Sequence, residues 1–319
     1  MLASLLAVVV GLAILVWSAD RFVSGATGLA QHWRLPPLLI GMLVMGFGTS
    51  APELAVSVSA AVQGSPALAL GNAYGSNIAN IGLILGITAL LSPIAVHSRV
   101  LKTELPVLVV LTLVAGWQLF DGVISRGESA LLLVLAVALT VWAVKQSGQQ
   151  STDALAEDVS AQASVSDLRA SALWTVVGLV ALVGSARLLV WGAVAVARAW
   201  GVDEVVIGLT VVAVGTSLPE LAASIAAVRK GAHDLALGNV LGSNLFNLLG
   251  VVGLAGVIQP IAVPDGVLAR DWVVMAGFTV SLFVLGYGFR GRLGRINRWE
   301  GAGLLGAYAA YTGWLVSTQ

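Results

Sequence analysis

Residues 46–53 read GFGTSAPE, and residues 213–220 read AVGTSLPE. Each stretch places a threonine, a serine, a proline and a glutamate inside an apolar run that carries no other charge. An unpaired carboxylate is costly in apolar surroundings. Two glutamates in matching contexts therefore indicate a site rather than an accident of composition.

The two stretches belong to a longer internal repeat. A shift of 167 residues aligns 40–80 with 207–247 without a gap, and 22 of the 41 aligned positions are identical. Apolar composition alone would not match Thr, Ser, Pro, Glu and Asn at one offset. The chain therefore contains two copies of one structural unit.

The composition is that of a polytopic membrane protein. Of 319 residues, 58% are hydrophobic and 10% are charged, whereas soluble proteins have roughly 25% charged residues. The first apolar run lacks the basic segment of a secretory signal and predicts an uncleaved span. The net charge of zero indicates no nucleic-acid partner, and the lack of cysteine excludes disulfides and thiolate metal sites.

Apolar runs separated by polar punctuation predict ten spans, each long enough to cross a bilayer. They are expected near 2–30, 36–61, 67–93, 103–120, 127–146, 170–199, 204–228, 234–258, 269–288 and 300–317. The fold class predicted is an all-α integral membrane protein. It divides into a first five-helix repeat at 1–145, a linker at 146–169 and a second five-helix repeat at 170–319.

The distribution of Lys and Arg predicts the orientation, because basic residues gather on the cytoplasmic side. With the N-terminus outside, eleven fall in inward loops and three in outward loops. The inward residues are Arg34, Arg99, Lys102, Lys145, Arg169, Arg229, Lys230, Arg290, Arg292, Arg295 and Arg298; the outward ones are Arg126, Arg198 and Arg270. Both termini are thus expected outside, with the 146–169 loop in the cytoplasm.

Five spans per repeat, an odd number, give the second copy the opposite orientation in the membrane. Inverted repeats with interrupted helices are typical of secondary transporters, which hold their substrate at the repeat interface near the midplane. The sequence therefore favours a transporter.

The repeated motif predicts a broken helix rich in oxygen atoms. Pro52 lacks an N–H and would leave the carbonyl of Gly48 without its helical partner. Thr49 and Ser50 lie four and three residues before Glu53, on neighbouring parts of one helix face. The second copy repeats this arrangement with Gly215, Thr216, Ser217, Pro219 and Glu220.

The following span of each copy adds an amide and hydroxyl stripe. The motifs GNAYGSNIAN (71–80) and GNVLGSNLFN (238–247) place polar residues at i+4 spacing. The stripes are Asn72, Ser76 and Asn80 in the first copy, and Asn239, Ser243 and Asn247 in the second. The GN and GS pairs also predict a second helix interruption. Hard oxygen ligands suit Ca²⁺ and alkali cations, and Ca²⁺ takes 6–8 oxygens in flexible geometry.

Two copies of GTSxPE, each followed by GNxxGSNxxN, resemble the α-repeats of the calcium/cation antiporter superfamily, specifically its prokaryotic sodium/calcium exchanger family. The motifs cover about a quarter of the chain. The resemblance implies an antiporter of Na⁺ and Ca²⁺ in a prokaryotic plasma (inner) membrane. It implies no enzyme activity, cofactor or obligatory protein partner.

The resemblance also implies ligand roles. Glu53 and Glu220 would be the central Ca²⁺ ligands and would also serve Na⁺. The remaining oxygens would come from Thr49, Ser50, Thr216, Ser217, Ser76, Ser243, Asn80 and Asn247, with backbone oxygens at Gly46 and Ala213. The first and sixth spans would slide past the other eight.

Three departures from the family pattern bear on ion choice. Asn247 stands where potassium-dependent relatives often carry Asp, which implies K⁺-independent transport. Gly46 stands where Ala is common, which a backbone ligand would tolerate. Gly75 and Gly242 stand where proton-coupled relatives usually have an acid, which favours Na⁺ over H⁺ coupling.

Several alternatives remain at this stage. A proton-coupled cation exchanger or a passive cation channel would also use buried acids. Asn72, Asn77, Asn239 and Asn244 could join helices rather than bind ions. Asp20, Arg21 and Arg187 could pair within or at the ends of their helices, or act at a sliding interface. The histidines His32, His97 and His233 are expected at the membrane surface, and residues 152–159 in a solvated linker.

Overall fold

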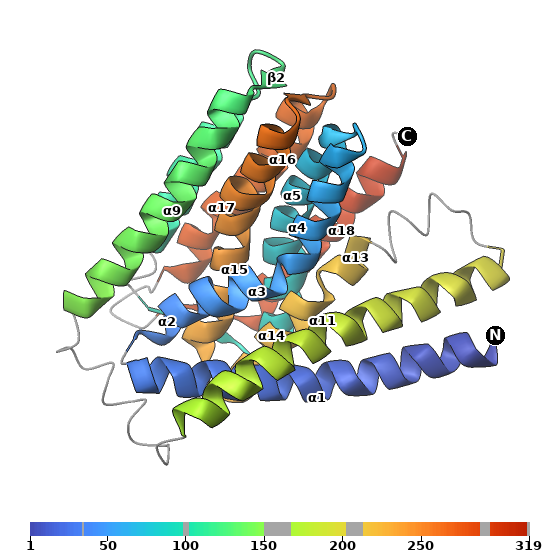
Figure 1. The fold of residues 1–319 in the computed structure, drawn as a ribbon, viewed down its shortest axis with the longest axis vertical. Helices are drawn as coiled ribbons and strands as arrows, with labels where there is room; N and C mark the ends of the chain where they lie inside the picture. Colours follow the sequence, from blue (N-terminus) through green and yellow to red (C-terminus); the bar gives the residue numbers. More distant parts are fainter. Residues whose placement is uncertain (34, 98–101, 150–166, 202–212, 288–293, 318–319) are drawn as a thin grey trace.

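The computed structural model describes residues 1–33, 35–97, 102–149, 167–201, 213–287 and 294–317 (Figure 1). These residues are predominantly helical. The first half contains α1 (Leu2–Trp33), α2 (Pro37–Ile40), α3 (Phe47–Thr49), α4 (Ala51–Val62), α5 (Pro66–Ala79), α6 (Gly86–Leu91), α8 (Glu104–Trp117) and α9 (Arg126–Gln149). The second half contains α11 (Leu168–Ala199), α13 (Ala213–Thr216), α14 (Leu218–Arg229), α15 (His233–Phe246), α16 (Val252–Ile258), α17 (Val273–Gly286) and α18 (Arg298–Ser317).

Several of these helices join through wider, π-helical turns into continuous rods. The turns are η1 (Gly41–Gly46), η2 (Asn80–Leu85), η4 (Asn247–Val251) and η5 (Val267–Trp272). η2 and η4 begin at equivalent asparagines of the two copies. Turns of this kind often occur at functional sites. The predicted interruptions at the GN and GS pairs are wrong, because α5 and α15 run unbroken through them.

Among the described residues, six helices are long and apolar enough to cross a membrane, or seven if the bent rod from α2 to α4 is one span. They are Leu2–Trp33, Pro66–Leu91, Arg126–Lys145, Leu168–Ala199, His233–Ile258 and Val267–Gly286. The chain is therefore a multi-pass membrane protein. Most of the first half of the predicted 204–228 span lies outside the described residues.

The breaks in the helices fall where the motif predicts them. Ser50 separates α3 from α4 with a bend of 46°, and Ser217 separates α13 from α14. The backbone ψ angles of the two serines are 7° and 3°, outside the helical range. Pro52 and Pro219 follow in the first turns of α4 and α14, where a missing N–H costs no helical hydrogen bond.

Short strands cross-connect the loops, which differs from the predicted all-α fold. β1 (Ile94–Val96) pairs antiparallel with β4 (Gly294–Ile296), and β2 (Val123–Ile124) pairs antiparallel with β3 (Ile261–Ala262). Each pair joins a loop of the first half to a loop of the second. Runs of two or three residues are too short to show the alternation that predicts a strand.

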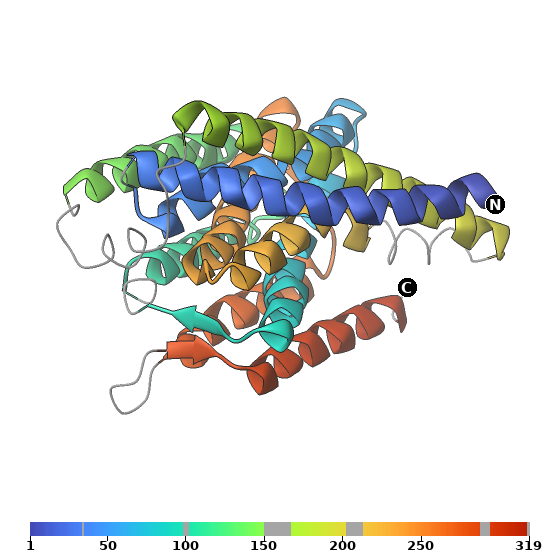
Figure 2. The same ribbon diagram turned by 90° about the horizontal axis from the view of Figure 1, so that it is seen from below.

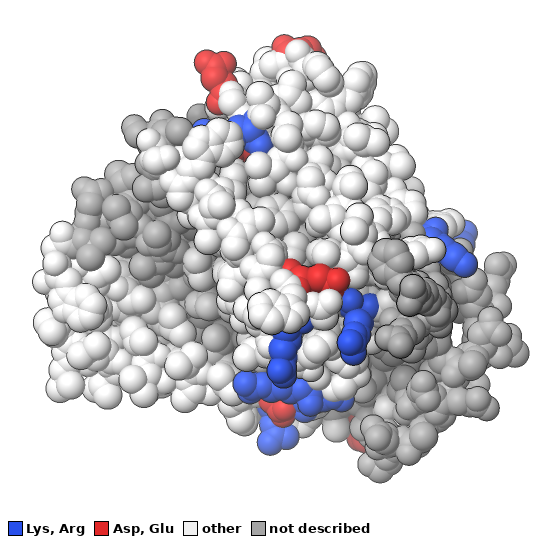
Figure 3. Space-filling model, turned by 180° about the vertical axis from the view of Figure 1, so that it is seen from behind, with Lys and Arg blue, Asp and Glu red and all other residues white. Residues whose placement is uncertain are grey.

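The core lies along α5 and α15. In the rods that contain these two helices, 72% of the residues in the apolar membrane-spanning stretch are buried. The corresponding share is 33% in α1 and 22% in α11. Figure 2 shows α1 and α11 together on one side of the molecule and α18 on the other. Figure 3 shows one face of the molecule with broad uncharged areas, as a lipid-exposed surface requires.

The outer helices α1 and α11 form an antiparallel pair with a close interface. A Cβ at Gly25 would lie 2.5 Å from the backbone N of Thr175, and one at Gly178 would lie 2.7 Å from that of Phe22. Close approach at small residues is the usual way for membrane helices to associate. The contacts repeat under the offset of the copies, since Gly192 approaches Ser4 as Gly25 approaches Ser171.

Polar contacts join α1 to the end of α14, and a further contact joins α1 to α11. Lys230, at the end of α14, lies 2.7 Å from Asp20 Oδ1 and donates to Ser24 Oγ at 2.9 Å. Arg21 lies over the ring of Trp174 of α11, 5.0 Å from its centroid. The predicted pairing of Asp20 within its own helix is therefore wrong, because its partner Lys230 follows α14 in the second half of the chain.

The interface predicts a contrast between two glycines of α11. Gly178→Ala should lower the melting temperature of the purified protein by several degrees, because the new methyl group collides with the backbone of Phe22. Gly184→Ala meets nothing within 4 Å and should leave the melting temperature unchanged or raise it slightly. Thermal unfolding in detergent measures both, and equal effects would contradict the close interface.

Candidate cation-binding site

Two buried glutamates from opposite halves of the chain define the site. Glu53 and Glu220 lie in the first turns of α4 and α14, and each is 1% exposed. The N-terminal turn of a helix favours negative charge. Ser50 Oγ donates to Glu220 Oε1 at 3.1 Å, so the broken helix of the first copy contacts the acid of the second. The Oε2 atoms of both glutamates have no hydrogen-bond partner within the described residues.

The serines and threonines of the motif are placed asymmetrically. Thr49 Oγ1 lies 2.9 Å from the carbonyl of Met45 and 3.1 Å from Asn239 Oδ1. Ser217 is 2% exposed, and its hydroxyl oxygen has no partner among the described residues. Thr216 ends α13, half-buried beside it. The second copy thus keeps a hydroxyl available where the first has used its equivalent, Ser50, on a glutamate.

Asn72 and Asn239 support the glutamates from behind. Asn72 Nδ2 donates to the carbonyl of Glu53 at 3.2 Å and to Ser57 Oγ at 3.0 Å. Asn239 Nδ2 donates to the carbonyl of Glu220 at 3.1 Å and to Ser224 Oγ at 3.0 Å. These amides hold each glutamate-bearing turn against the neighbouring helix. Their hydrogen bonds therefore favour a role in joining helices over a role in binding an ion.

Four further asparagines meet between α5 and α15, and all are 1% exposed. Asn80 Nδ2 donates to Asn244 Oδ1 at 2.9 Å, and Asn247 Nδ2 donates to Asn77 Oδ1 at 3.1 Å. The two bonds are equivalent under the offset of the copies. The side-chain oxygens of Asn80 and Asn247 have no partner among the described residues. Both begin π-helical turns, η2 packing on α14 and η4 on α4, the helices that carry the glutamates.

The remaining predicted residues lie at the edges of this cluster. Ser243 is fully buried and donates to the carbonyl of Gly46 at 3.2 Å, while Ser76 is 6% exposed. A Cβ at Gly46 would lie 2.7 Å from the backbone N of Ser243, so the close packing of η1 on α15 accounts for glycine there. Ala213 begins α13, and its side chain lies outside the described residues.

Sequence reasoning did not identify Asn77 and Asn244 as part of this cluster. Both lie one residue from the predicted stripe, and a stripe at i+4 spacing selects one helix face. The only signal was the repeated SN pair at 76–77 and 243–244. Their importance comes from contacts between the halves, which the spacing within one helix does not contain.

The cluster is suited to a cation because it offers oxygens and negative charge, and the described residues include no buried Lys or Arg beside it. Three ion pairs among the described residues lie elsewhere, between Lys230 and Asp20, Arg270 and Asp271, and His97 and Asp234. Hydroxyl, amide and carboxylate oxygens are the ligands of Ca²⁺ and other hard cations. We call this cluster the oxygen cage: Glu53, Glu220, Ser217, Asn80 and Asn247, each with an unpartnered side-chain oxygen.

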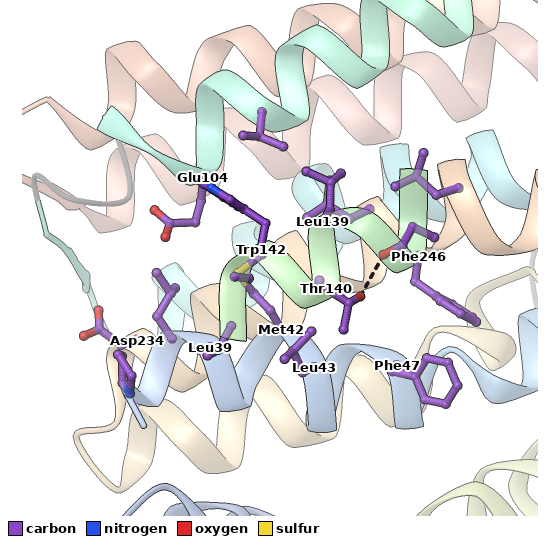
Figure 4. A pocket seen from close by; sticks show the side chains of 18 of the residues that line it. Leu39, Met42, Leu43, Phe47, Glu104, Leu139, Thr140, Trp142, Asp234 and Phe246 are labelled. Atoms are coloured by element: carbon purple, nitrogen blue, oxygen red, sulfur yellow. Dashed lines mark hydrogen bonds between the residues drawn. The ribbon is translucent and has the colours of Figure 1, made fainter. Parts of the chain in front are cut away.

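A separate cavity of about 280 Å³ lies between α2, α8, α9 and α15. Its walls are mostly apolar and include Met42, Phe47 and Phe246 (Figure 4). Neither Glu53 nor Glu220 lines it. The cavity is therefore not the cation site.

The described helices are those of a multi-pass membrane protein, and the cage gives it a buried group of oxygens suited to a cation. A family model described as sodium/calcium exchanger protein matches residues 3–145 and 170–317. The chain therefore belongs to the sodium/calcium exchanger family, a family of ion transporters.

Relatives cover nearly the whole chain. It is 44% identical over 315 residues to the putative antiporter CaxA of Alkalimonas amylolytica, which covers 98% of both chains. It is 42% identical over 279 residues to the inner membrane protein YrbG of Escherichia coli, 86% of both. A solved structure of the sodium-calcium exchanger NCX_Mj superposes with a TM-score of 0.84 at 30% identity, covering 98% of this chain and 99% of the other.

Proposed function

We propose that this protein is a secondary antiporter that exchanges Na⁺ for Ca²⁺ across a prokaryotic plasma membrane. One observation carries the proposal: two buried glutamates from opposite halves, brought close through the Ser50 contact to Glu220, each keep a carboxylate oxygen without a partner among the described residues. The names of the relatives support it, since one is a sodium-calcium exchanger and another a putative antiporter. The transported ions are substrates, and no cofactor is required.

Exchange follows from competition for the same charges. The two carboxylates of Glu53 and Glu220 together carry two negative charges, which one Ca²⁺ neutralises. Na⁺ ions need the same oxygens, so the cage cannot fully satisfy Ca²⁺ and several Na⁺ ions at once. Binding of one ion therefore favours release of the other, provided the cage opens to one side at a time.

The architecture proposed is two inverted five-helix repeats, at 1–145 and 170–319, joined by a cytoplasmic linker at 146–169. The antiparallel α1 and α11 support it, because their glycine contacts repeat at the offset of the copies. The pair lies on one side of the core and is suited to move as a unit. With both termini outside, the Lys230 contact to Asp20 would lie toward the cytoplasm.

Transport into vesicles tests the proposal. Radiolabelled Ca²⁺ uptake into everted membrane vesicles should rise when an imposed Na⁺ gradient drives Na⁺ out of the vesicle, and should collapse when the Na⁺ gradient is dissipated. Uptake that follows a pH gradient and ignores Na⁺ would assign proton coupling instead. Flux that needs no counter-ion would indicate a channel.

Transport should not depend on K⁺. Asn247 supplies an amide, which has no charge to hold an additional monovalent cation beside Ca²⁺ and Na⁺. Na⁺-driven Ca²⁺ uptake should therefore be the same within about 20% when K⁺ in the medium is replaced by N-methylglucamine at constant ionic strength. A requirement for K⁺ would contradict the assignment of this residue.

A further inference from the structure

The side-chain amide of Asn247, a member of the oxygen cage, is oriented by a residue that does not belong to the cage. Asn247 ends its planar side chain in an oxygen on one side and an NH₂ group on the other, and only the oxygen attracts a cation. The NH₂ group donates to Asn77 Oδ1 at 3.1 Å, which leaves the Asn247 oxygen without a partner among the described residues. Which group faces the cage therefore depends on Asn77.

Asn77 is itself held in a single orientation. Its Nδ2 donates to the backbone carbonyl of Asn244 at 3.2 Å and lies 3.7 Å from the sulfur of Met275. A backbone carbonyl can only accept, and a thioether sulfur is a weak acceptor. Both neighbours require the NH₂ group of Asn77 on that side, so its oxygen must face Asn247.

We infer that Asn77 is a positioning residue that turns the side-chain oxygen of Asn247 toward the bound cation. Three groups carry this orientation in sequence: the Asn244 carbonyl, the Asn77 amide and the Asn247 amide. All three residues are 1% exposed, so water does not compete for these bonds. The inference rests on the proposed function, and it adds a residue that touches no ion.

The equivalent hydrogen bond of the other copy, between Asn80 and Asn244, does not fix the orientation of its two amides. Asn80 Nδ2 donates to Asn244 Oδ1 at 2.9 Å, but Asn244 Nδ2 has no partner among the described residues. A joint rotation of Asn80 and Asn244 would preserve their mutual bond. The inference is therefore confined to Asn77 and Asn247.

The test measures how much Asn247 contributes to Ca²⁺ affinity in three backgrounds. The full chain is purified into lipid nanodiscs, and the Kd is measured with ⁴⁵Ca²⁺ alone. Asn247→Ala should weaken binding about tenfold when Asn77 is present, because one oxygen ligand is lost. In the Asn77→Ala background the same substitution should change the Kd less than about twofold, because the oxygen is no longer oriented.

The third background separates positioning from folding. Asn77→Asp keeps the size of the side chain and an oxygen that accepts from Asn247, so the tenfold effect of Asn247→Ala should persist. The added charge acts on both members of that comparison and cancels. The Asn77→Asp background also tests the inference if Asn77→Ala fails to fold. A change in Kd of twofold or less on Asn247→Ala in this background would overturn the inference. Thr112→Ala serves as the control and should leave the Kd unchanged, because Thr112 is buried in α8 and its hydroxyl bonds the carbonyl of Leu108 in its own helix.

The outcomes distinguish the inference from the proposed function. Independent losses, in which Asn247→Ala costs tenfold in every background, would make Asn77 merely structural and overturn the inference. Absence of Ca²⁺ binding by the wild-type protein would instead overturn the proposed function, and the inference with it. Both the proposed function and the inference are supported if the wild-type protein binds Ca²⁺ and the effect of Asn247→Ala on the Kd disappears only in the Asn77→Ala background.

Discussion

Glu53→Gln and Glu220→Gln should each abolish Na⁺-driven Ca²⁺ uptake, with a loss of at least about 100-fold, or about 2.7 kcal/mol. Glutamine keeps the size and one oxygen of the side chain but removes a negative charge. The cage would then hold a divalent cation against a single carboxylate, because Glu53 and Glu220 are its only acidic side chains among the described residues. Both glutamates are 1% exposed, so solvent cannot replace the missing charge.

The two variants should fail to similar degrees, because the glutamates occupy equivalent turns of the two copies. Uptake into everted vesicles, normalised to the amount of protein in the membrane, measures the loss. Asp121→Asn is the matched control: an exposed acid outside the cage, whose bond from the Val123 N–H an amide oxygen can still accept. Normal transport by either glutamate variant would contradict the site.

The glutamate pair also shows what the sequence predicts well. Costly groups in an apolar run must be satisfied by the fold, so the repeated motif predicts both the helix breaks and the shared site. Ser50 and Ser217 do separate the helices, and Ser50 does reach the glutamate of the other copy. Helices begin and end within a few residues of the ten expected spans wherever the structure describes them, and six of these helices, or seven with the bent rod, are long and apolar enough to cross a membrane.

Other features depend on contacts that no local pattern contains. The π-helical turns η2 and η4 begin at Asn80 and Asn247, although the glycines before them predicted interruptions one or two turns earlier. In the second copy these glycines serve packing, because a Cβ at Gly238 or Gly242 would collide with the backbone of Leu38 or Met42. In the first copy a Cβ at Gly71 or Gly75 would meet nothing within 4 Å, so close packing does not account for those glycines. Close approach and hinge formation both favour glycine, and only the position of the opposite helix distinguishes them.

The role of Asn77 illustrates the same limit at the level of a single side chain. Its hydrogen bonds reach Asn244 and Asn247, about 170 residues away in the chain. The amide of Asn77 is satisfied only when the two repeats pack together. Sequence spacing can place this residue on a helix, but the direction of its oxygen is a property of the assembled interface.

Calcium should raise the melting temperature of the purified wild-type protein, and removal of Ca²⁺ and Na⁺ should lower it. In the absence of a cation, Glu53 and Glu220 each bury a carboxylate oxygen that has no partner among the described residues, which destabilises the folded state. A ligand that binds only the folded state adds about 2.7 kcal/mol at 100 times its Kd. For a chain of this size that corresponds to an increase on the order of 5 °C.

The glutamate variants should show the reverse pattern, which separates ligand binding from a general effect of salt. Glu53→Gln removes one of the two buried charges, so its ion-free melting temperature should equal or exceed that of the wild type, while the increase with Ca²⁺ disappears. Mg²⁺ at the same ionic strength should give little increase, because it loses its hydration shell reluctantly. Thermal unfolding with chelator, Ca²⁺, Na⁺ or Mg²⁺ measures these differences, and an equal Ca²⁺ effect in Glu53→Gln would place the stabilising ion outside the cage.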